Sequence, residues 1–182
     1  MTAATFVSTN PGKFREVRDL LAPYGVRVRW SRRVLPEPQA ETLEEVVTAK
    51  LDAVRDLRGN VLVEDSGLFI SSLNGFPGVY SAHFLNSWKF GPILELLEHR
   101  RRQACFRTVA GLQRNGRRRM FVGEVWGRIA RRPMGRNGFG YDPIFVPDGW
   151  DRTFAEAPAS AKNGVSHRAR AFRKVGRALA AD

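Results

Sequence analysis

The sequence predicts an α/β domain with a mixed β-sheet, and three observations support this fold class. Short runs of β-branched and aromatic residues alternate with amphipathic helical stretches, which is typical of strand–helix–strand units. Two longer strand-like runs, joined across Arg114-Asn115-Gly116, predict a hairpin. The 182 residues are 43% hydrophobic, so one domain, or one domain in two lobes, can bury a core without a disulfide.

Periodicity and turn signals place the individual elements along the chain. The expected strands are residues 3–9, 26–30, 61–63, 103–113, 120–129 and 144–146. The expected helices are one beginning at Lys13, then residues 43–57 and 88–98, and a last helix capped by Ser166. Asn10-Pro11-Gly12 predicts a turn before the first helix, and Ser66-Gly67 predicts a tight turn after the third strand, with residues 68–71 extended beyond it.

Composition limits the classes of function. The 30 Lys and Arg residues exceed the 18 Asp and Glu residues by 12, and such a positive field attracts nucleic acid, anionic lipid or nucleotide phosphates, although it also serves general solubility. The lone Cys105 predicts a reducing compartment. No secretory signal pattern is present, and glycines, prolines and asparagines in residues 66–88 argue against a membrane span. We therefore expect a cytoplasmic protein without membrane association.

The segment Ser8–Lys13, with the sequence STNPGK, connects the first strand to the first helix. Backbone N–H groups at a helix start, the hydroxyls of Ser8 and Thr9, and the Lys13 ammonium all suit a phosphate group. The spacing does not match the P-loop pattern GxxxxGK[ST]. An ordinary turn between a strand and a helix is the alternative interpretation.

Two adjacent carboxylates, Glu64 and Asp65, directly follow the buried strand 61–63. Open α/β sheets bind ligands at the carboxyl ends of their strands, and a carboxylate there can hold a divalent cation or orient a water. Because successive strand side chains point to opposite faces, only one of the two is expected in a site. A solvated charged turn is the alternative.

Three further segments carry residues suited to a nucleotide. Glu37 lies between two prolines, which hold its carboxylate on a stiff extended segment. Glycines around Phe139 and Tyr141 allow close approach of the backbone and leave an aromatic face for a base. Residues 162–168 gather cations and a histidine at a helix start. A surface glutamate, a packed loop and a capped helix with solvated cations are the respective alternatives.

Together and in this order, these segments resemble the inosine/xanthosine triphosphate pyrophosphatase family. The matching segments are STNPGKFRE (8–16), PEPQAE (36–41), VEDSGLFISSLNGFPGVYSA (63–82), GFGYDPIFVPDG (138–149), TFAE (153–156) and KNGVSHRARAF (162–172). They extend from near the N-terminus to the last helix. The resemblance implies that residues 1–182 form one domain, with two α/β lobes around a long mixed β-sheet, a substrate groove between the lobes, and a homodimer.

The resemblance also implies an activity, namely Mg²⁺-dependent hydrolysis of noncanonical purine nucleoside triphosphates (ITP, dITP, XTP) to the monophosphate and pyrophosphate. It implies that Asp65 is the proton acceptor and a metal ligand, with Glu37 as the second metal ligand. The implied substrate-binding residues are Ser8, Thr9, Asn10, Pro11, Gly12, Lys13, Ser66, Phe139, Gly140, Tyr141, Asp142, Lys162, His167 and Arg168. Among them, Phe139 is expected against the base, and His167 and Arg168 at its edge.

Two more residues have expected supporting roles. Glu16 is expected to support Lys13 as a neighbouring partner. Lys50 matches the family less closely, because the spacing around it varies among relatives.

Two other functions stay open at this point. A related nucleotide pyrophosphatase would prefer pyrimidine or methylated substrates. A basic nucleic-acid-binding module would use the net charge and the Arg-rich runs 100–102 and 117–119. Glu37, Glu64 and Asp65 would repel a nucleic-acid backbone in the same groove, so stable nucleic-acid binding is not expected.

Overall fold

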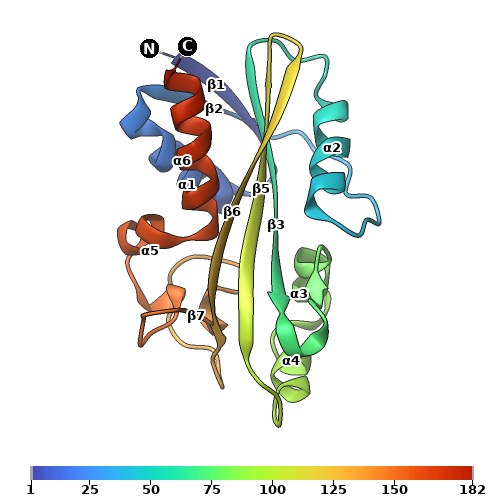
Figure 1. The fold of residues 1–182 in the computed structure, drawn as a ribbon, viewed down its shortest axis with the longest axis vertical. Coiled ribbons are helices and arrows are strands. Elements are labelled where there is room, and N and C mark those ends of the chain that lie inside the picture. The colour runs from blue at the N-terminus through green and yellow to red at the C-terminus, as the bar shows by residue number, and fades with distance from the viewer. Residues whose placement is uncertain (1, 182) are drawn as a thin grey trace. The chain divides into compact units, whose positions relative to one another are not determined.

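A computed structural model describes residues 2–181, which form a mixed α/β fold (Figure 1). The strands are β1 (Thr2–Val7), β2 (Val26–Ser31), β3 (Asn60–Ile70), β4 (Pro77–Gly78), β5 (Gln103–Arg114), β6 (Arg117–Ile129) and β7 (Phe145–Pro147). The helices are α1 (Pro11–Leu21), α2 (Leu43–Ala53), α3 (Ser81–Trp88), α4 (Gly91–Leu96), α5 (Ala159–Val165) and α6 (His167–Ala180). Short 3-10 turns lie at Ala22–Tyr24, Ser71–Leu73, Asp142–Ile144 and Phe154–Glu156.

The sheet has the strand order β2-β1-β3-β5-β6-β7, and β4 pairs with β3 outside this path. β1 runs parallel to both β2 and β3, whereas β4 is antiparallel to β3 and β7 is antiparallel to β6. The predicted mixed sheet is therefore confirmed.

The chain forms two compact units, and each unit is built from separate stretches of sequence. Unit 1 contains the residues up to Asp65, Thr108–Gly123 and the residues from His167 onward. Unit 2 contains Ser66–Arg107 and Glu124–Ser166. β3, β5 and β6 each contribute residues to both units.

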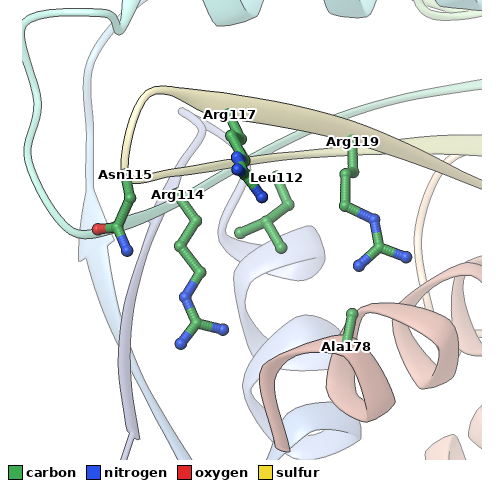
Figure 2. Close-up of a pocket in the computed structure, with 6 residues that line it drawn as sticks. All are labelled: Leu112, Arg114, Asn115, Arg117, Arg119 and Ala178. Carbon is green, nitrogen blue, oxygen red and sulfur yellow. The ribbon is translucent and has the colours of Figure 1, made fainter. Parts of the chain in front are cut away.

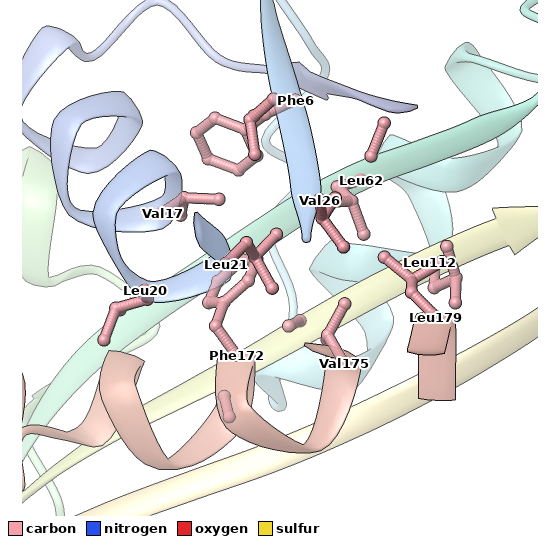
Figure 3. Close-up of a cluster of buried hydrophobic side chains, with 14 of the residues drawn as sticks. Phe6, Val17, Leu20, Leu21, Val26, Leu62, Leu112, Phe172, Val175 and Leu179 are labelled. Atoms are coloured by element: carbon pink, nitrogen blue, oxygen red, sulfur yellow. The ribbon is translucent and has the colours of Figure 1, made fainter. Parts of the chain in front are cut away.

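The core of unit 1 lies between the sheet and the helix pair α1 and α6 (Figure 3). Val17 and Leu21 of α1 and Phe172 of α6 are buried there with Phe6 and Leu62 from the sheet. The rings of Phe6 and Phe172 meet edge to face, with their centroids 6.1 Å apart. Phe172, Val175 and Leu179 recur at helical spacing and form the buried face of α6.

The opposite face of this part of the sheet is covered by α2. A Cβ added to Gly111 of β5 would lie 2.8 Å from Val47 of α2 and 3.1 Å from Val63 of β3. A Cβ added to Gly123 of β6 would instead collide with the backbone of α6, at His167 O and Ala171 N. Glycines at these two positions let a helix lie directly against each face.

Unit 2 has its own core, built around a cluster of aromatic rings. Phe106 of β5 lies 4.7 Å from Phe145 of β7 between ring centroids, and Phe145 lies 5.4 Å from Phe154. Ile70 of β3 and Ile93 of α4 complete the buried set around them. Within residues 2–181, no helix combines the length and the hydropathy needed to cross a bilayer.

The predicted hairpin is confirmed, since Asn115 and Gly116 both have positive φ (48° and 74°), as a two-residue turn of this kind requires. Two predicted turns are wrong. Asn10-Pro11-Gly12 is the start of α1, with Asn10 as its N-cap and Pro11 in its first turn. Ser66-Gly67 continues β3, which pairs with β4 from Leu68 onward.

Several helix boundaries differ from the prediction. The second helix ends at Ala53 and not at residue 57. The expected helix 88–98 is only α4, and α3 precedes it unpredicted. α5 was also not predicted, because its sequence ASAKNGV contains two poor helix formers and almost no apolar periodicity.

Candidate active site

The turn between β1 and α1 is held in one shape by hydrogen bonds. Asn10 Oδ1 accepts from the backbone N–H of Lys13 at 3.0 Å, and Ser8 Oγ accepts from that of Asn10 at 3.1 Å. Trp30 Nε1 donates to the Ser8 carbonyl at 2.7 Å, and the Trp30 ring stacks on Phe14 at 4.8 Å. This segment therefore presents the N-terminus of an 11-residue helix in a fixed geometry, as an anion site needs.

Lys13 belongs to a buried network of four charged side chains in unit 1. It forms an ion pair with Glu64, whose other oxygen lies 3.2 Å from Arg168. Arg168 also pairs with Glu16 at 2.7 Å. The two cations and two carboxylates balance, which is how charges buried to this depth are stabilised. Glu16 pairs with Arg168, which also pairs with Glu64, the partner of Lys13. The expected support of Lys13 by Glu16 stays a prediction.

Asp65 lies on the opposite face of β3 from Glu64, as strand alternation predicts. Asp65 Oδ1 accepts from Lys50 Nζ of α2 at 2.7 Å, while Lys50 also donates to Glu37 Oε1 at 3.2 Å and to the Glu64 carbonyl at 3.3 Å. The side chains of Lys50 and Asp65 are 5% and 10% exposed, whereas that of Glu37 is 66% exposed. Asp65 therefore lies in a buried charge pair, and Glu37 reaches the same ammonium from the surface.

Burial and charge act against each other on this pair. Burial raises the pKa of the Asp65 carboxyl, and the nearby charges of Lys50 and Lys13 only partly oppose that rise. For Lys50, burial acts to lower the pKa of the ammonium, but the charges of Asp65, Glu37 and Glu64 outweigh it and raise that pKa. At neutral pH Lys50 is a fixed cation beside a carboxylate of increased basicity.

Asp65 lies at a place in the sheet where a ligand is expected. β3 does not end at Asp65, but its parallel pairing with β1 extends only to Phe6 with Leu62. Asp65 thus lies beyond the carboxyl end of its parallel neighbour, where α/β sheets bind ligands.

Glu37 and Asp65 are suited to a hard divalent cation. Both carboxylates contact the same Lys50 nitrogen, so their oxygens converge on one small region. Mg²⁺ is usually held by one or two carboxylates together with substrate phosphates and water. Within residues 2–181, no cluster of three or more His, Cys, Asp or Glu residues is arranged for a metal ion.

A second set of predicted residues lies in unit 2 and is organised by Asp142. Its Oδ2 accepts from Lys162 Nζ at 2.5 Å and from the backbone N–H of Phe139 at 2.8 Å. Lys162 Nζ also lies 4.7 Å from the centre of the half-exposed Phe139 ring. Gly138, at φ 74°, has no room for a Cβ because Asp142 Oδ2 occupies that place.

Tyr141 is placed differently from its neighbours. It is buried, and its hydroxyl donates to the Ser81 carbonyl at 2.9 Å. Burial raises the pKa of this phenol, so it is a neutral donor at physiological pH. Tyr141 belongs to the aromatic core of unit 2, which is the structural alternative considered for this loop.

The structure thus divides the sequence-predicted residues between the two units. Unit 1 holds Ser8–Lys13, Glu37, Asp65, His167 and Arg168, and unit 2 holds Ser66, Phe139–Asp142 and Lys162. His167 is buried at the start of α6, and Gly140 is exposed. Their contacts with substrate stay predictions.

Lys50 is the residue that sequence reasoning undervalued. It lies four residues after Val46 and three after Val47, on the apolar face of the predicted helix. A lysine at such a position needs a buried partner, and the chain contains only five lysines. That signal was available without the structure.

Comparison with known proteins identifies the family of this chain. The model of the Ham1 family matches residues 4–178. The dITP/XTP pyrophosphatase of Thermococcus kodakarensis is 46% identical over 93% of this chain and 92% of its own, and that of Pyrococcus horikoshii is 43% identical over 92% and 91%. A HAM1 protein structure from Coxiella burnetii superposes over all of both chains with a TM-score of 0.85 at 30% identity. These matches confirm the family resemblance of the sequence motifs, and the chain belongs to the Ham1 family.

Proposed function

We propose that this protein hydrolyses noncanonical purine nucleoside triphosphates, such as dITP, XTP and ITP, to the monophosphate and pyrophosphate. The single observation that carries the proposal is the buried Asp65–Lys50 pair, one residue from the carboxylate that anchors Lys13 of the phosphate turn. The names of the relatives from Pyrococcus horikoshii and Thermococcus kodakarensis supply the substrate class.

The turn Ser8–Lys13 is the proposed phosphate site. A triphosphate carries about four negative charges, and the N-terminus of α1 and the Lys13 ammonium offset part of them. Glu64 and Arg168 hold the Lys13 side chain in place, so little ordering is left to be done when substrate binds.

Asp65 is the proposed general base for the attacking water. Its burial raises the carboxyl pKa, which makes it a better proton acceptor, while Lys50 keeps it ionised and oriented. Positioned general bases contribute about 10²–10⁴-fold to a rate. Lys50 is a positioning residue in this scheme.

Mg²⁺ is the proposed metal, and Glu37 and Asp65 would hold it. Its chemistry is to neutralise charge on phosphate oxygens and to stabilise the leaving pyrophosphate. Lys50 donates to both carboxylates in the structure, so one cation holds their oxygens near the same point.

Base selection is assigned to the residues expected near the base. The half-exposed Phe139 is the proposed stacking face, held by Asp142 and Lys162. Hypoxanthine and xanthine offer an O6 acceptor where adenine offers an amino donor, so a site of donors discriminates between them. Arg168, expected at the base edge, is bound to Glu16 and Glu64, and would have to leave them to reach a base.

A substrate panel tests the function. Pyrophosphate release is measured with Mg²⁺ on ITP, dITP and XTP, on ATP and GTP, and on pyrimidine and methylated triphosphates. The proposal requires much faster release from the first group than from the others. Asp65→Asn should abolish turnover with an unchanged fold by circular dichroism; near-normal turnover in that variant refutes the proposal.

The family resemblance and the cysteine content also bear on assembly and on cellular location. We propose a homodimer, on the family resemblance, and a cytoplasmic location, on the lone buried Cys105. Sedimentation equilibrium at micromolar protein tests the first, and a monomer contradicts it.

A further inference from the structure

A basic hollow of about 630 Å³ lies at the β5–β6 hairpin of unit 1, and none of the candidate active-site residues lines it. Its lining residues are Leu112, Arg114, Asn115, Arg117, Arg119 and Ala178. Three of these six are arginines and none is acidic. Figure 2 shows the arginine side chains extending from the hairpin toward the side on which Ala178 of α6 lies.

Strand alternation separates the arginines of β6 into two groups. Arg118 points to the α2 face, where it donates to Asp52 at 2.6 Å and to the Leu51 carbonyl at 3.3 Å. Arg117 and Arg119, one residue to either side, point to the α6 face. Within residues 2–181, neither of them forms an ion pair, whereas Arg118 does.

The side chain of Arg119 is held in place by an aromatic ring. The Arg119 guanidinium lies 5.0 Å above the Phe121 ring, and Phe121 packs against the core of unit 1. A cation stacked in this way has lost part of its freedom before any ligand arrives. Converging guanidinium groups repel one another, and an anion with several oxygens relieves that repulsion through paired hydrogen bonds.

We propose that the basic hollow binds the phosphate groups of a small polyphosphate anion, such as inorganic pyrophosphate or a nucleoside polyphosphate. Guanidinium forks match phosphate oxygens, and the volume is that of a small-molecule site. The six described lining residues offer guanidinium groups for phosphate oxygens and no aromatic face for a base.

A small anion suits the structure better than a nucleic-acid strand. A second hollow of about 750 Å³ shares Asn115, and Arg55, Arg58 and Arg118 line it together with the carboxylate of Asp56. Arg118 is paired with Asp52, and Asp56 at its edge accepts from Arg33 at 2.9 Å. A purely basic lining therefore does not continue around the hairpin, because Asp52 and Asp56 would repel part of a long phosphate backbone there.

The test is titration calorimetry with inorganic pyrophosphate in buffer containing EDTA. Wild type is compared with Arg117→Ser/Arg119→Ser, with Arg118→Ser as a matched charge loss on the other face, and with Lys13→Ala. We expect the double variant to lose at least tenfold in affinity for one binding event. Arg118→Ser should change it less than twofold, and Lys13→Ala should leave it intact. Arg117→Lys/Arg119→Lys should restore it in part, since lysine keeps the charge without the fork.

Three results overturn the proposal. The double variant titrates like wild type, or Arg118→Ser weakens binding equally, which indicates only the general field of the protein. Alternatively, a 20-nucleotide single strand binds through Arg117 and Arg119 while pyrophosphate does not, which makes the surface a nucleic-acid site. Melting temperatures confirm that each variant is folded, and turnover of the double variant separates this site from the proposed function.

Discussion

Replacement of Lys50 by methionine tests how much the buried Asp65 carboxylate depends on a neighbouring positive charge for its stability. The substitution keeps most of the side-chain volume and removes the ammonium that lies 2.7 Å from Asp65 Oδ1. Breaking a buried ion pair by removing one partner costs about 3–5 kcal/mol, because the other charge is left uncompensated. Since Glu37 is largely exposed, water compensates it, and the loss centres on Asp65. We expect the free energy of unfolding at pH 8 to fall by about 3 kcal/mol.

The sign of the pH dependence follows from the same carboxyl group. Without Lys50, burial raises the folded-state pKa of Asp65 further above its unfolded value, so the folded variant binds more protons than the unfolded chain. Its stability deficit is therefore largest above the folded pKa, and shrinks as the pH falls through that pKa toward the unfolded value. Urea unfolding at pH 8 and pH 5 measures both values.

The matched control is Lys174→Met, which removes an exposed lysine that donates only to the Val122 carbonyl. It should change the free energy of unfolding by less than about 0.5 kcal/mol at either pH. The reasoning fails if Lys50→Met costs under about 1 kcal/mol at pH 8, or if its deficit is the same at both pH values.

Two further substitutions test the metal site and the packing of α6. Glu37→Gln should raise the Mg²⁺ concentration for half-maximal turnover by about tenfold, which is within the range seen when metal affinity is perturbed. Its melting temperature should not change, because the side chain is exposed. An unchanged Mg²⁺ dependence would remove Glu37 from the site. Gly123→Ala should destabilise by about 1–3 kcal/mol, because its Cβ would collide with His167 O and Ala171 N, whereas Gly91→Ala, with open space around it, should be close to neutral in thermal unfolding. Equal melting temperatures for the two alanine variants would contradict the close approach of α6.

Local pattern was enough to predict the elements whose signals are local. The hairpin at Asn115-Gly116 needs two residues that tolerate positive φ, and the sequence supplies them. The separation of Glu64 and Asp65 to opposite faces follows from strand geometry alone. The N-cap at Asn10 is not among the predicted features, because Asn10-Pro11-Gly12 is also a typical turn sequence.

Features that depend on distant partners were not predictable in this way. Ser66-Gly67 has the composition of a turn, but Gly67 is needed inside β3 because a Cβ there would collide with the carbonyl oxygen of Gly78. The ion pair of Glu16 with Arg168 joins residues from nearly opposite ends of the sequence. A single sequence contains no direct sign of such a pairing.

The link between Arg168 and Glu16 spans 152 residues, and it closes the network that holds Lys13. During synthesis, β1, the phosphate turn and β3 leave the ribosome long before α6 exists. Until then Glu16 and Glu64 lack their shared cation, and the core of unit 1 lacks the apolar side chains of α6. The charged network around Lys13 is therefore complete only after α6 has been made, so this part of the site reaches its final geometry late in synthesis.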